Sequence, residues 1–392
     1  MPPVLIIATL LTGTGPTGVE THFRQLIAAA RDVGIDARLV SAQHSKDVRR
    51  KVASLVHRLL KRVVPEHAVR FMREADARHL ERKLTRTVST LVGRTIVVSA
   101  QDPLSARSAL RIRHQRPMRI VMTAHFNVSE AKEMLDKGLT TMDGPLWRHI
   151  MDVERTTLPR LDHLIFVSEY MQARVLERRP ELREHSRSVI HNFCARPEPE
   201  SAASAVDRDL IAIGTLEPRK NQGFLLDVLA ACRQRGHRYT LTIAGDGPDR
   251  QTLAQRTSDL DLDEQVTFLG NLPNAARLLY RHRVLVHAAR MENMPLVLVE
   301  ALATGRPALV GPVGGIPEVV RHDVEGLHWP LDSPTRAADQ LIALLESPAQ
   351  WLRLSDAARH RYDKCFAPGV LAPKWLYAML AGPEGTLPSH NT

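Results

Sequence analysis

Short apolar runs alternate with longer helical stretches along nearly all of the 392 residues, and this alternation limits the fold more than any other feature. It is the β-α-β pattern of a parallel sheet that is covered on both faces. In the first half we expect strands at Val4–Thr9, Ala37–Ser41, Ile96–Ala100, Ile120–Thr123, Leu164–Val167 and Val189–Ile190. In the second half we expect strands at Leu210–Ile213, Tyr239–Ala244, Val266–Leu269, Val284–His287 and Ala308–Val310.

A polar stretch at 195–208, with Pro, Ser and Ala but no apolar periodicity, separates the two halves and has the composition of a linker. The sequence therefore predicts an α/β protein with two Rossmann-like, doubly wound domains that face a cleft. Ligands of such sheets bind at the carboxyl ends of the strands. The expected parts are an N-terminal domain 1–194 with a basic helical insert 44–94, the linker 195–208, a C-terminal domain 209–370, a helix 371–381 that packs back on the N-terminal domain, and a disordered tail 382–392.

The composition is that of an ordinary globular protein, with 44% hydrophobic and 24% charged residues. Its three cysteines, Cys194, Cys232 and Cys365, are widely spaced and form no metal-binding pattern, so we expect free thiols in a reducing compartment. No cationic stretch precedes the apolar run at Val4, and no run of ~18 apolar residues occurs. We therefore expect a cytoplasmic protein without a membrane span.

Positive charge is concentrated at 44–94, a segment with 14 Lys/Arg and 5 Asp/Glu in a chain of net charge +10. Within it, 48–64 reads as an amphipathic helix. Its apolar stripe consists of Val52, Leu55, Val56, Leu59, Leu60 and Val63, and its cations include Arg50, Lys51, Arg58, Lys61 and Arg62. Two interpretations stay open: a helix packed on its own domain, and a peripheral helix on the anionic inner face of a membrane. Nucleic acid is not expected as a partner, because no recognition motif occurs and aromatic residues are only 4%.

The sharpest motif is the segment 291–315, MENMPLVLVEALATGRPALVGPVGG. Glu292 follows an expected strand, Pro295 is suited to the start of a helix, and Gly305 to its end. Glu300 then lies within the helix, about two turns from its start. The N–H groups around Met294, Pro295 and Leu296 would bind a phosphate, and the carboxylates would accept hydrogen bonds from sugar hydroxyls.

This pattern resembles the Glu-x7-Glu motif of the retaining glycosyltransferases of family 4. Three further segments resemble the same family: Gly214–Asn221 (GTLEPRKN) its phosphate-binding segment, Ala244–Pro248 (AGDGP) its characteristic turn, and Gly314–Glu318 (GGIPE) its second glycine-rich helix start. Thr17–Glu20 (TGVE) resembles the N-terminal glycine loop of the family, and His125 stands where the family has a histidine in the cleft. The resemblance covers nearly the whole chain, in order.

The resemblance implies the transfer of a hexose-type sugar from a UDP- or GDP-sugar to a glycan or lipid-linked acceptor, without a metal or other cofactor. Lys220 would neutralise the leaving diphosphate. Glu292 would bind hydroxyls of the donor sugar, and Glu300 would bind the ribose. His125 would contact the sugar near its reacting carbon.

Two positions depart from the family pattern. The family often has Arg after the first glycine of the phosphate-binding segment, where this chain has Thr215, and the neighbouring Arg219 is a candidate for the second cation. Thr17 replaces the usual first glycine of the N-terminal loop, so only Gly18 leaves room for backbone N–H groups to approach the diphosphate.

Other functions have weaker support in the sequence. Gly13–Gly18 spells G-x-G-x-x-G, the fingerprint of dinucleotide-dependent oxidoreductases, but Ser41, Ala42 and Gln43 end the second strand where that fingerprint needs an acidic residue. Asp259–Asp263 contains a D-x-D, which we interpret as a solvated turn rather than a metal site. A nucleotide-sugar epimerase of the same architecture stays open, and the intact Glu292 and Lys220 argue against an inactive binding module.

Overall fold

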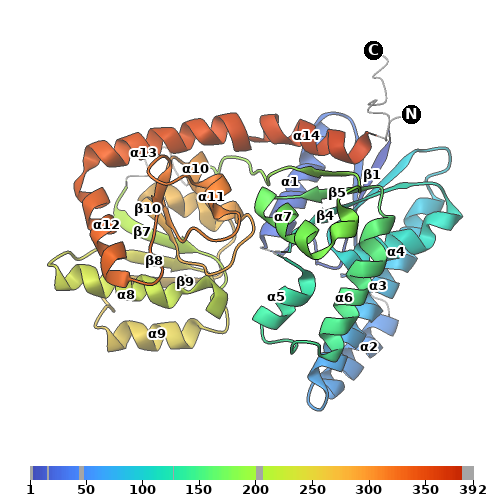
Figure 1. The fold of residues 1–392 in the computed structure, drawn as a ribbon, viewed down its shortest axis with the longest axis horizontal. Coiled ribbons are helices and arrows are strands. Elements are labelled where there is room, and N and C mark those ends of the chain that lie inside the picture. The colour runs from blue at the N-terminus through green and yellow to red at the C-terminus, as the bar shows by residue number, and fades with distance from the viewer. Residues whose placement is uncertain (1–2, 16, 44–47, 127, 200–205, 382–392) are drawn as a thin grey trace. The chain divides into compact units, whose positions relative to one another are not determined.

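The structure is a computed structural model that describes residues 3–15, 17–43, 48–126, 128–199 and 206–381. It confirms the predicted fold class, because the chain forms two α/β units, each with a parallel sheet and flanking helices (Figure 1). Unit 1 comprises residues 1–191 and 371–392, and unit 2 comprises residues 192–370. The predicted tail 382–392 and the middle of the predicted linker, 200–205, lie outside the described residues.

The sheet of unit 1 has six described parallel strands in the order β2-β1-β3-β4-β5-β6. Their bounds are β1 Val4–Thr9, β2 Asp36–Ser41, β3 Ile96–Ala100, β4 Arg119–Ala124, β5 His163–Phe166 and β6 Arg187–Val189. Every residue of β1 is buried, as expected for a central strand covered on both faces. Because β1 pairs with both β2 and β3, the point at which the strand order reverses lies between β1 and β3.

Helices cover this sheet, and several begin at a side chain that caps their first turn. Asp102, Ser129 and Ser168 each accept a hydrogen bond from the backbone N–H three residues ahead, which satisfies a donor that the helix itself leaves free. The helices of this part are α1 Gly18–Asp32, α2 Val48–Leu60, α3 Pro65–Ser89, α4 Pro103–Ile112, α5 Glu130–Asp136, α6 Pro145–Thr157, α7 Glu169–Arg178 and α14 Pro368–Leu380, whose first residues belong to unit 2.

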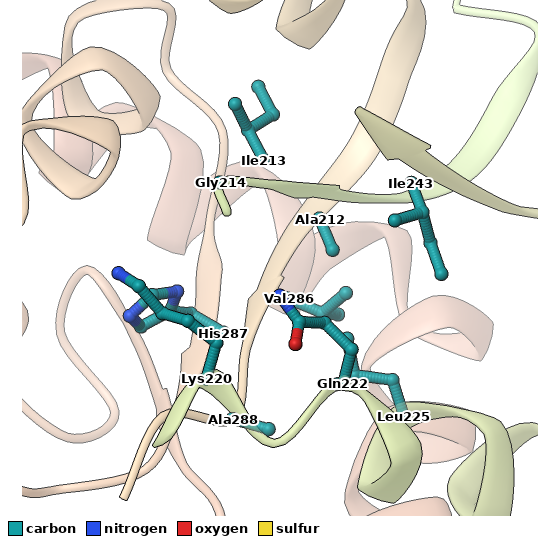
Figure 2. Close-up of a pocket in the computed structure, with 10 residues that line it drawn as sticks. All are labelled: Ala212, Ile213, Gly214, Lys220, Gln222, Leu225, Ile243, Val286, His287 and Ala288. Carbon is teal, nitrogen blue, oxygen red and sulfur yellow. The ribbon is translucent and has the colours of Figure 1, made fainter. Parts of the chain in front are cut away.

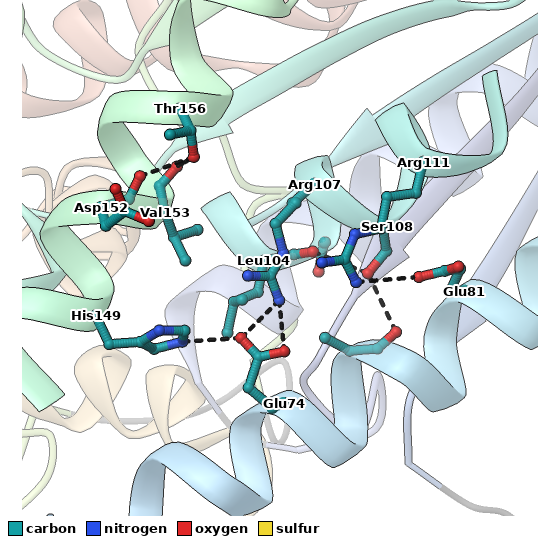
Figure 3. Close-up of polar contacts among 12 residues, drawn as sticks. Glu74, Glu81, Leu104, Arg107, Ser108, Arg111, His149, Asp152, Val153 and Thr156 are labelled. Atoms are coloured by element: carbon teal, nitrogen blue, oxygen red, sulfur yellow. Dashed lines mark hydrogen bonds and ion pairs between the residues drawn. The ribbon is translucent and has the colours of Figure 1, made fainter. Parts of the chain in front are cut away.

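An ion-pair cluster joins α3, α4 and α6 (Figure 3). The Glu74 carboxylate on α3 accepts two hydrogen bonds of 2.7 Å from Arg107 on α4 and lies 2.8 Å from Nε2 of His149 on α6. Burial alone would raise the pKa of Glu74, but His149 and Arg107 outweigh it and lower the pKa to about 2. The Glu74 carboxylate therefore stays ionised at neutral pH, and its contacts hold three helices of unit 1 together.

The last helix, α14, packs on the rest of unit 1. Nε1 of Trp375 donates a hydrogen bond of 2.9 Å to the carbonyl of His191, and Arg119 on β4 donates to the carbonyls of Met379 and Ala378. A cation at the C-terminal carbonyls of a helix is favourable, because these groups have no partner within the helix.

Helix α2 is amphipathic but ends at Leu60, earlier than the predicted end at Pro65. The predicted apolar stripe is divided: Val56 and Leu60 are half-buried, whereas Val52, Leu55, Leu59 and Val63 are 52–80% exposed. None of the described helices is long and apolar enough to cross a membrane.

The sheet of unit 2 has six described parallel strands in the order β12-β11-β10-β7-β8-β9. Their bounds are β7 Arg208–Ile213, β8 Leu241–Ala244, β9 Val266–Gly270, β10 His282–His287, β11 Ala308–Val310 and β12 Gly326–His328. The sequence did not predict β12. This is the strand order of dinucleotide-binding domains, in which the order reverses between the first and fourth strands, here β7 and β10.

The helices of unit 2 enclose a continuous apolar core, and α8 and α12 pack side by side. Large buried side chains such as Trp329 and Phe224, whose ring centroids lie 5.8 Å apart, fill it. The helices are α8 Gln222–Gln234, α9 Arg250–Asp259, α10 Leu296–Ala303, α11 Ile316–Val319, α12 Pro334–Glu346 and α13 Pro348–Arg361.

The chain passes from unit 1 to unit 2 between His191 and Asn192, earlier than the predicted boundary at 194. The reason is that the residues that follow bind within unit 2. The carbonyl of Cys194 accepts a hydrogen bond of 2.9 Å from Tyr362, and Arg196 pairs with Asp363 at 2.8 Å.

Candidate functional site

The candidate site of unit 2 lies at the carboxyl ends of β7 and β10, where the strand order of the sheet reverses. The loop after β7 contains the short helix η4 (Pro218–Lys220), and the loop after β10 leads to Glu292. Several hydrogen bonds join the loops: among them, Arg290 N–H donates to the carbonyl of Arg219 at 2.8 Å, and Nδ2 of Asn221 donates to the carbonyl of Ala288 at 3.2 Å. Lys220 and Glu292, separated by 72 residues in the sequence, are thereby brought to one point.

Lys220 and Glu292 form a direct ion pair between Nζ and Oε1. Glu292 is 7% exposed, and its carboxylate also lies 3.5 Å from Nε2 of His287 and 3.6 Å from Arg219. Burial opposes the ionised form of Glu292, but Lys220, His287 and Arg219 outweigh it and hold the pKa of that carboxyl well below its usual range. Glu292 is therefore an ionised acceptor throughout the physiological pH range.

Arg219 is shared between two carboxylates. Its Nε lies 2.6 Å from Glu217, and the same guanidinium reaches Glu292. Thr215, which stands where relatives often have Arg, is exposed. Arg219 therefore adds a second positive charge to the surroundings of Glu292.

A small pocket lies at the ends of β7 and β10, and Lys220 and His287 are both part of its lining (Figure 2). Gln222 lines another part of the pocket and donates a hydrogen bond of 2.9 Å to the carbonyl of Thr215. The remaining lining is mainly apolar, from the ends of β7, β8 and β10 and from α8. Burial lowers the pKa of His287, so its imidazole is neutral beside the ion pair at neutral pH.

The turn 244–249 supports the loop that carries Lys220. Leu216 N–H donates to the carbonyl of Asp246, and Asp249 N–H donates to the carbonyl of Leu216, at 3.0 and 3.1 Å. Gly245 has a φ of +150°, and a Cβ there would lie 1.9 Å from the carbonyl oxygen of Gly214. The AGDGP motif therefore acts as a backbone support that only glycine permits.

Gly314 supports Glu292 in the same way. Its φ is +58°, and a Cβ there would lie 1.7 Å from the backbone carbonyl oxygen of Glu292. The following helix, α11, has only four residues. The close approach of its backbone to Glu292 thus explains why the GGIPE motif begins with glycine.

Helix α10 begins at Leu296, with Pro295 as its N-cap in extended conformation, and Gly305 follows its end with a φ of +68°. Met294 is 5% exposed, and its carbonyl accepts a hydrogen bond of 3.3 Å from Nδ2 of Asn192. Asn192 N–H also lies 3.1 Å from Sδ of Met294. The first N–H groups of α10 have no acceptor inside the helix.

Glu300 lies on α10 apart from the ion pair, and no hydrogen bond or salt bridge joins it to Glu292 in the part of the chain that the structure describes. Its side chain has no hydrogen-bond partner among these residues. Burial raises the pKa of Glu300 to about 7. Glu292 and Glu300 therefore differ strongly in their protonation at neutral pH.

The glycine-rich loop of unit 1 closes around an acidic side chain that the sequence did not single out. The Glu20 carboxylate accepts hydrogen bonds from the N–H groups of Gly13 and Gly15, at 2.7 and 3.1 Å, and from the hydroxyls of Thr12 and Thr17. Burial opposes its ionisation, but these four donors lower the pKa of Glu20. The inner N–H groups of the loop are thus already occupied by an anion of the chain itself.

Thr17 and Gly18, the predicted substrate contacts in unit 1, are exposed at the start of α1. Thr17 is the N-cap: its hydroxyl accepts a hydrogen bond of 3.2 Å from Glu20 N–H and donates to the Glu20 carboxylate. Gly18 is the first helical residue, so its N–H has no acceptor within the helix.

His125 follows β4, at the carboxyl edge of the sheet of unit 1. Its Nε2 lies 3.0 Å from Oε1 of Gln101, which follows β3, and its ring makes an edge contact with His22 at a centroid distance of 5.7 Å. Burial lowers the pKa of His125 to about 4. The imidazole is therefore neutral at physiological pH and held from two sides.

Two family models match this chain in tandem and together cover most of it. Glycosyltransferase family 4 matches residues 16–194, and glycosyl transferases group 1 matches residues 198–361. The chain belongs to glycosyltransferase family 4. Both of its matched domains are therefore glycosyltransferase domains.

Curated relatives of this glycosyltransferase include two bacterial enzymes. It is 36% identical over 119 residues to the N-acetyl-alpha-D-glucosaminyl L-malate synthase of Bacillus anthracis, across 30% of this chain and 31% of that one. It is 29% identical over 220 residues to the GDP-mannose-dependent alpha-(1-6)-phosphatidylinositol monomannoside mannosyltransferase of Mycobacterium tuberculosis, across 50% and 57%. These matches span less than two thirds of the length of either relative.

Solved structures with the same fold cover nearly the whole glycosyltransferase. Sucrose-phosphate synthase of Thermosynechococcus elongatus has a TM-score of 0.70 and 18% identity, across 96% of this chain and 97% of that one. Anabaena HepE in complex with UDP and glucose has a TM-score of 0.67 and 17% identity, across 96% and 98%. The comparisons give no support to an oxidoreductase or an epimerase.

The structure also bears on the dinucleotide fingerprint of the glycosyltransferase. The inner N–H groups of that loop contact Glu20. Where the fingerprint needs an acidic residue, at the end of β2, the hydroxyl of Ser41 donates to the carbonyl of Leu11. Asp36, at the other end of β2, pairs with Arg38 at 2.7 Å.

The three carboxylates of the D-x-D segment each have a neighbouring partner side chain. In the D-x-D segment, Asp259 accepts a hydrogen bond from Gln255, Asp261 lies 3.6 Å from Arg233, and Asp263 accepts one from Ser258. Among the described residues, no group of three or more His, Cys, Asp or Glu side chains has a metal-binding arrangement. Cys194 and Cys232 are buried free thiols, and Cys365 is a half-buried one.

Proposed function

We propose that this glycosyltransferase is a retaining enzyme that moves a hexose-type sugar from a UDP- or GDP-sugar to a glycan or lipid-linked acceptor, in the synthesis of a cell-surface polysaccharide or glycolipid. The observation that carries the proposal is the buried Lys220–Glu292 pair at the point where the strand order of unit 2 reverses. An activated sugar matches both partners, because its diphosphate is an anion and its sugar is a set of hydroxyl donors.

Donor binding exchanges the partners of this pair. Lys220 moves its contact from Glu292 to diphosphate oxygens, and the freed Glu292 carboxylate accepts hydrogen bonds from sugar hydroxyls. Negative charge grows on the diphosphate as its bond to the sugar breaks, so a cation already in place stabilises the transition state. The leaving phosphate takes the proton of the acceptor on the same face of the sugar, which leaves positioning and electrostatics as the main catalytic contributions.

The other candidate residues complete the donor site. The first N–H groups of α10, from Leu296 onward, bind phosphate oxygens, Pro295 sets the start of the helix as its N-cap, and Met294 fixes this loop in place. Glu300 accepts hydrogen bonds from the ribose. Arg219 adds a second positive charge for the diphosphate.

In unit 1, Thr17 and Gly18 expose the first N–H groups of α1, which approach the diphosphate. His125 contacts the sugar near its reacting carbon. No metal or other cofactor takes part, because cationic side chains and helix N-termini supply the positive charge. Relatives support a nucleotide donor: the mycobacterial mannosyltransferase is named as GDP-mannose-dependent, and Anabaena HepE was crystallised with UDP and glucose.

Thermal unfolding of the full chain with a panel of UDP- and GDP-sugars, with and without EDTA, tests the donor class. We expect one nucleotide class to raise Tm, to the same extent in EDTA, since a ligand that binds only the folded state stabilises it. The Lys220→Ala variant should lose this shift. A shift with NAD or FAD and none with any nucleotide sugar would contradict the proposal.

We further propose that α2 places the enzyme on an anionic membrane surface, at the cytoplasmic face, where a lipid-linked acceptor is held. Val52, Leu55, Leu59 and Val63 form an exposed apolar face on and just after α2. Beside it, Lys51, Arg58, Lys61 and Arg62 are exposed and have no ion-pair partner among the described residues. Apolar side chains that enter the headgroup layer and cations that contact anionic lipid are the two contributions to such binding.

Sedimentation with phosphatidylserine-containing vesicles tests this surface. Exchange of Arg58, Lys61 and Arg62 for Gln should weaken binding strongly, since each cation contributes ~1 kcal/mol near an anionic surface. The matched control exchanges Arg238, Arg336 and Arg353, three exposed cations of unit 2, for Gln, with the same loss of net charge and no expected effect. Equal binding by both triple variants would leave α2 without a membrane role.

A further inference from the structure

Gln101 has a fixed orientation although it lies in no helix or strand. It directly follows β3, is 5% exposed, and its backbone N–H donates to the carbonyl of Ala8 on β1 at 3.0 Å. Its side-chain Nε2 donates to the carbonyl and to the hydroxyl of Ser99, at 3.3 and 3.1 Å. A carbonyl oxygen can only accept a hydrogen bond, so the amide nitrogen must face Ser99 and the amide oxygen must face the other way.

The amide oxygen of Gln101 faces Nε2 of His125. Because this oxygen can only accept, Nε2 of His125 must carry a proton and donate. The ring is neutral, since burial holds the pKa of His125 at about 4, and a neutral imidazole has one proton. Nδ1 is therefore unprotonated, and the structure records no hydrogen-bond partner for it among the described residues.

The titratable neighbour of His125 is His22 on α1. His22 is 1% exposed and packs against Trp375 of α14 at a centroid distance of 4.6 Å. Burial and the nearby His125 hold the pKa of His22 well below its usual range, so this second ring is also neutral. Among the described residues, the groups that contact the His125 ring here are thus a neutral imidazole and an amide, and neither offers a positive charge to an anion.

We propose that Gln101, oriented by Ser99, is a positioning residue that fixes the Nε2–H tautomer of His125, so that the ring presents Nδ1 to a substrate hydroxyl. The inference rests on the proposed function, because it assigns the substrate group that His125 receives. That group is a neutral hydrogen-bond donor, a sugar hydroxyl, and neither a phosphate nor a carboxylate. The tautomer is set by residues that do not touch the substrate.

The first test reads the tautomer directly, without substrate or activity. Nitrogen-15 NMR of histidine-labelled full-length protein at pH 7 should show a protonated Nε2 and a bare Nδ1 for His125, with the signal assigned from the His125→Gln spectrum. Gln101→Met keeps the side-chain length but removes the acceptor, and it should give a mixture of both tautomers. The inference would be overturned if the His125 ring of the wild type were protonated at Nδ1, or if Gln101→Met left the tautomer of His125 unchanged.

The second test uses the pH profile of transfer. Gln101→Met should lower kcat/KM by about tenfold, the usual effect of one misdirected hydrogen bond. In Gln101→Glu, a carboxylate beside His125 raises the pKa of the imidazole, and the protonated ring can no longer accept at Nδ1. We therefore expect the acid limb of kcat/KM to move up into the range of about pH 5–7, a change that a merely structural role of Gln101 would not cause.

The Lys220→Ala variant distinguishes failure of the proposed function from failure of the positioning role of Gln101. Full transfer activity in Lys220→Ala would contradict the proposed function, whatever the tautomer of His125. A strongly impaired Lys220→Ala together with wild-type kcat/KM and pH profile in both Gln101 variants would contradict only the positioning role of Gln101.

Discussion

The two units carry loops at equivalent places, each between the first strand of the sheet and the following helix, but the two loops hold different charged groups. In unit 1 the loop closes around the Glu20 carboxylate, which accepts from Gly13 and Gly15 N–H groups. In unit 2 the loop presents Arg219 and Lys220, whose carboxylate partners are Glu217 in the same loop and Glu292 in the loop after β10. The first loop already holds an anion of its own, whereas the second holds cations whose partners can be exchanged.

This difference shows that a sequence can match a phosphate-binding motif although the N–H groups of the loop are not free to bind a phosphate. Gly13–Gly18 has the spacing of a dinucleotide fingerprint, and the strand and helix around it are those that the fingerprint requires. One acidic side chain in the first turn of α1 takes the inner donors that a phosphate would use. We therefore expect the diphosphate to depend mainly on unit 2, while unit 1 supplies the exposed start of α1 and the neutral His125.

The largest loss of transfer activity should come from removal of either partner of the Lys220–Glu292 ion pair. Lys220→Ala and Glu292→Gln should each lower the transfer rate at least ~100-fold, because each removes a preorganised group that stabilises the developing charge or holds the sugar. Steady-state kinetics with the donor identified by thermal unfolding measures this effect. Near-normal turnover in either folded variant would remove the proposed mechanism.

The matched change in the other loop is Glu20→Gln. It removes the negative charge but keeps an acceptor for Gly13 and Gly15, so the affinity for the nucleoside diphosphate should change by less than about threefold, below the value of one hydrogen bond. Calorimetric titration of both variants makes the comparison direct. If Glu20→Gln weakened diphosphate binding as much as Lys220→Ala, the two loops would not differ in function as the structure indicates.

The next effect should come from the backbone support of Glu292. Gly314→Ala places a Cβ against the Glu292 carbonyl, at a φ that favours glycine, so the loop must shift away from Lys220. We expect a loss of transfer of tens of fold, since a displacement of about 1 Å can cost ~100-fold. Gly369→Ala is the control, because no atom lies within 4 Å of its added Cβ. Equal activity of the two variants would show that the Glu292 loop tolerates the shift.

Much of the fold was predictable from the sequence, because buried parallel strands appear as continuous apolar runs. All five predicted strands of unit 2 are present, but β12 was missed, since three residues with one histidine give no periodicity. The order of the strands within each sheet, and hence the place where it reverses, comes from pairing between distant segments. The sequence could therefore place Lys220 and Glu292 at strand ends without showing that they form an ion pair.

The functional residues that were not predicted from the sequence differ in whether the sequence contains a signal for them. Glu20 had a readable signal, because Thr17 and Glu20 have the spacing of a capping box. Gln101 had none, since its role depends on Ser99 and His125, which come together only in the folded sheet. The support that Gly314 gives to Glu292 was likewise hidden, because the motif at 314–318 reads as a helix start and its contact lies 22 residues earlier in the chain.

A further effect, on the pH dependence of donor affinity, should distinguish the two carboxylates of the 291–315 motif. Glu292 is ionised at every pH of interest, whereas burial raises the pKa of Glu300 to about 7. A carboxylate accepts stronger hydrogen bonds from ribose hydroxyls than a carboxylic acid does, so donor affinity should rise with pH through this value. Between pH 6 and pH 8 the ionised fraction of such a group grows by about tenfold, and the affinity should follow it. Calorimetric titration of UDP or GDP across this range should show the rise in the wild type and a flat profile in Glu300→Gln, while an equal slope in both would assign the pH dependence to another group.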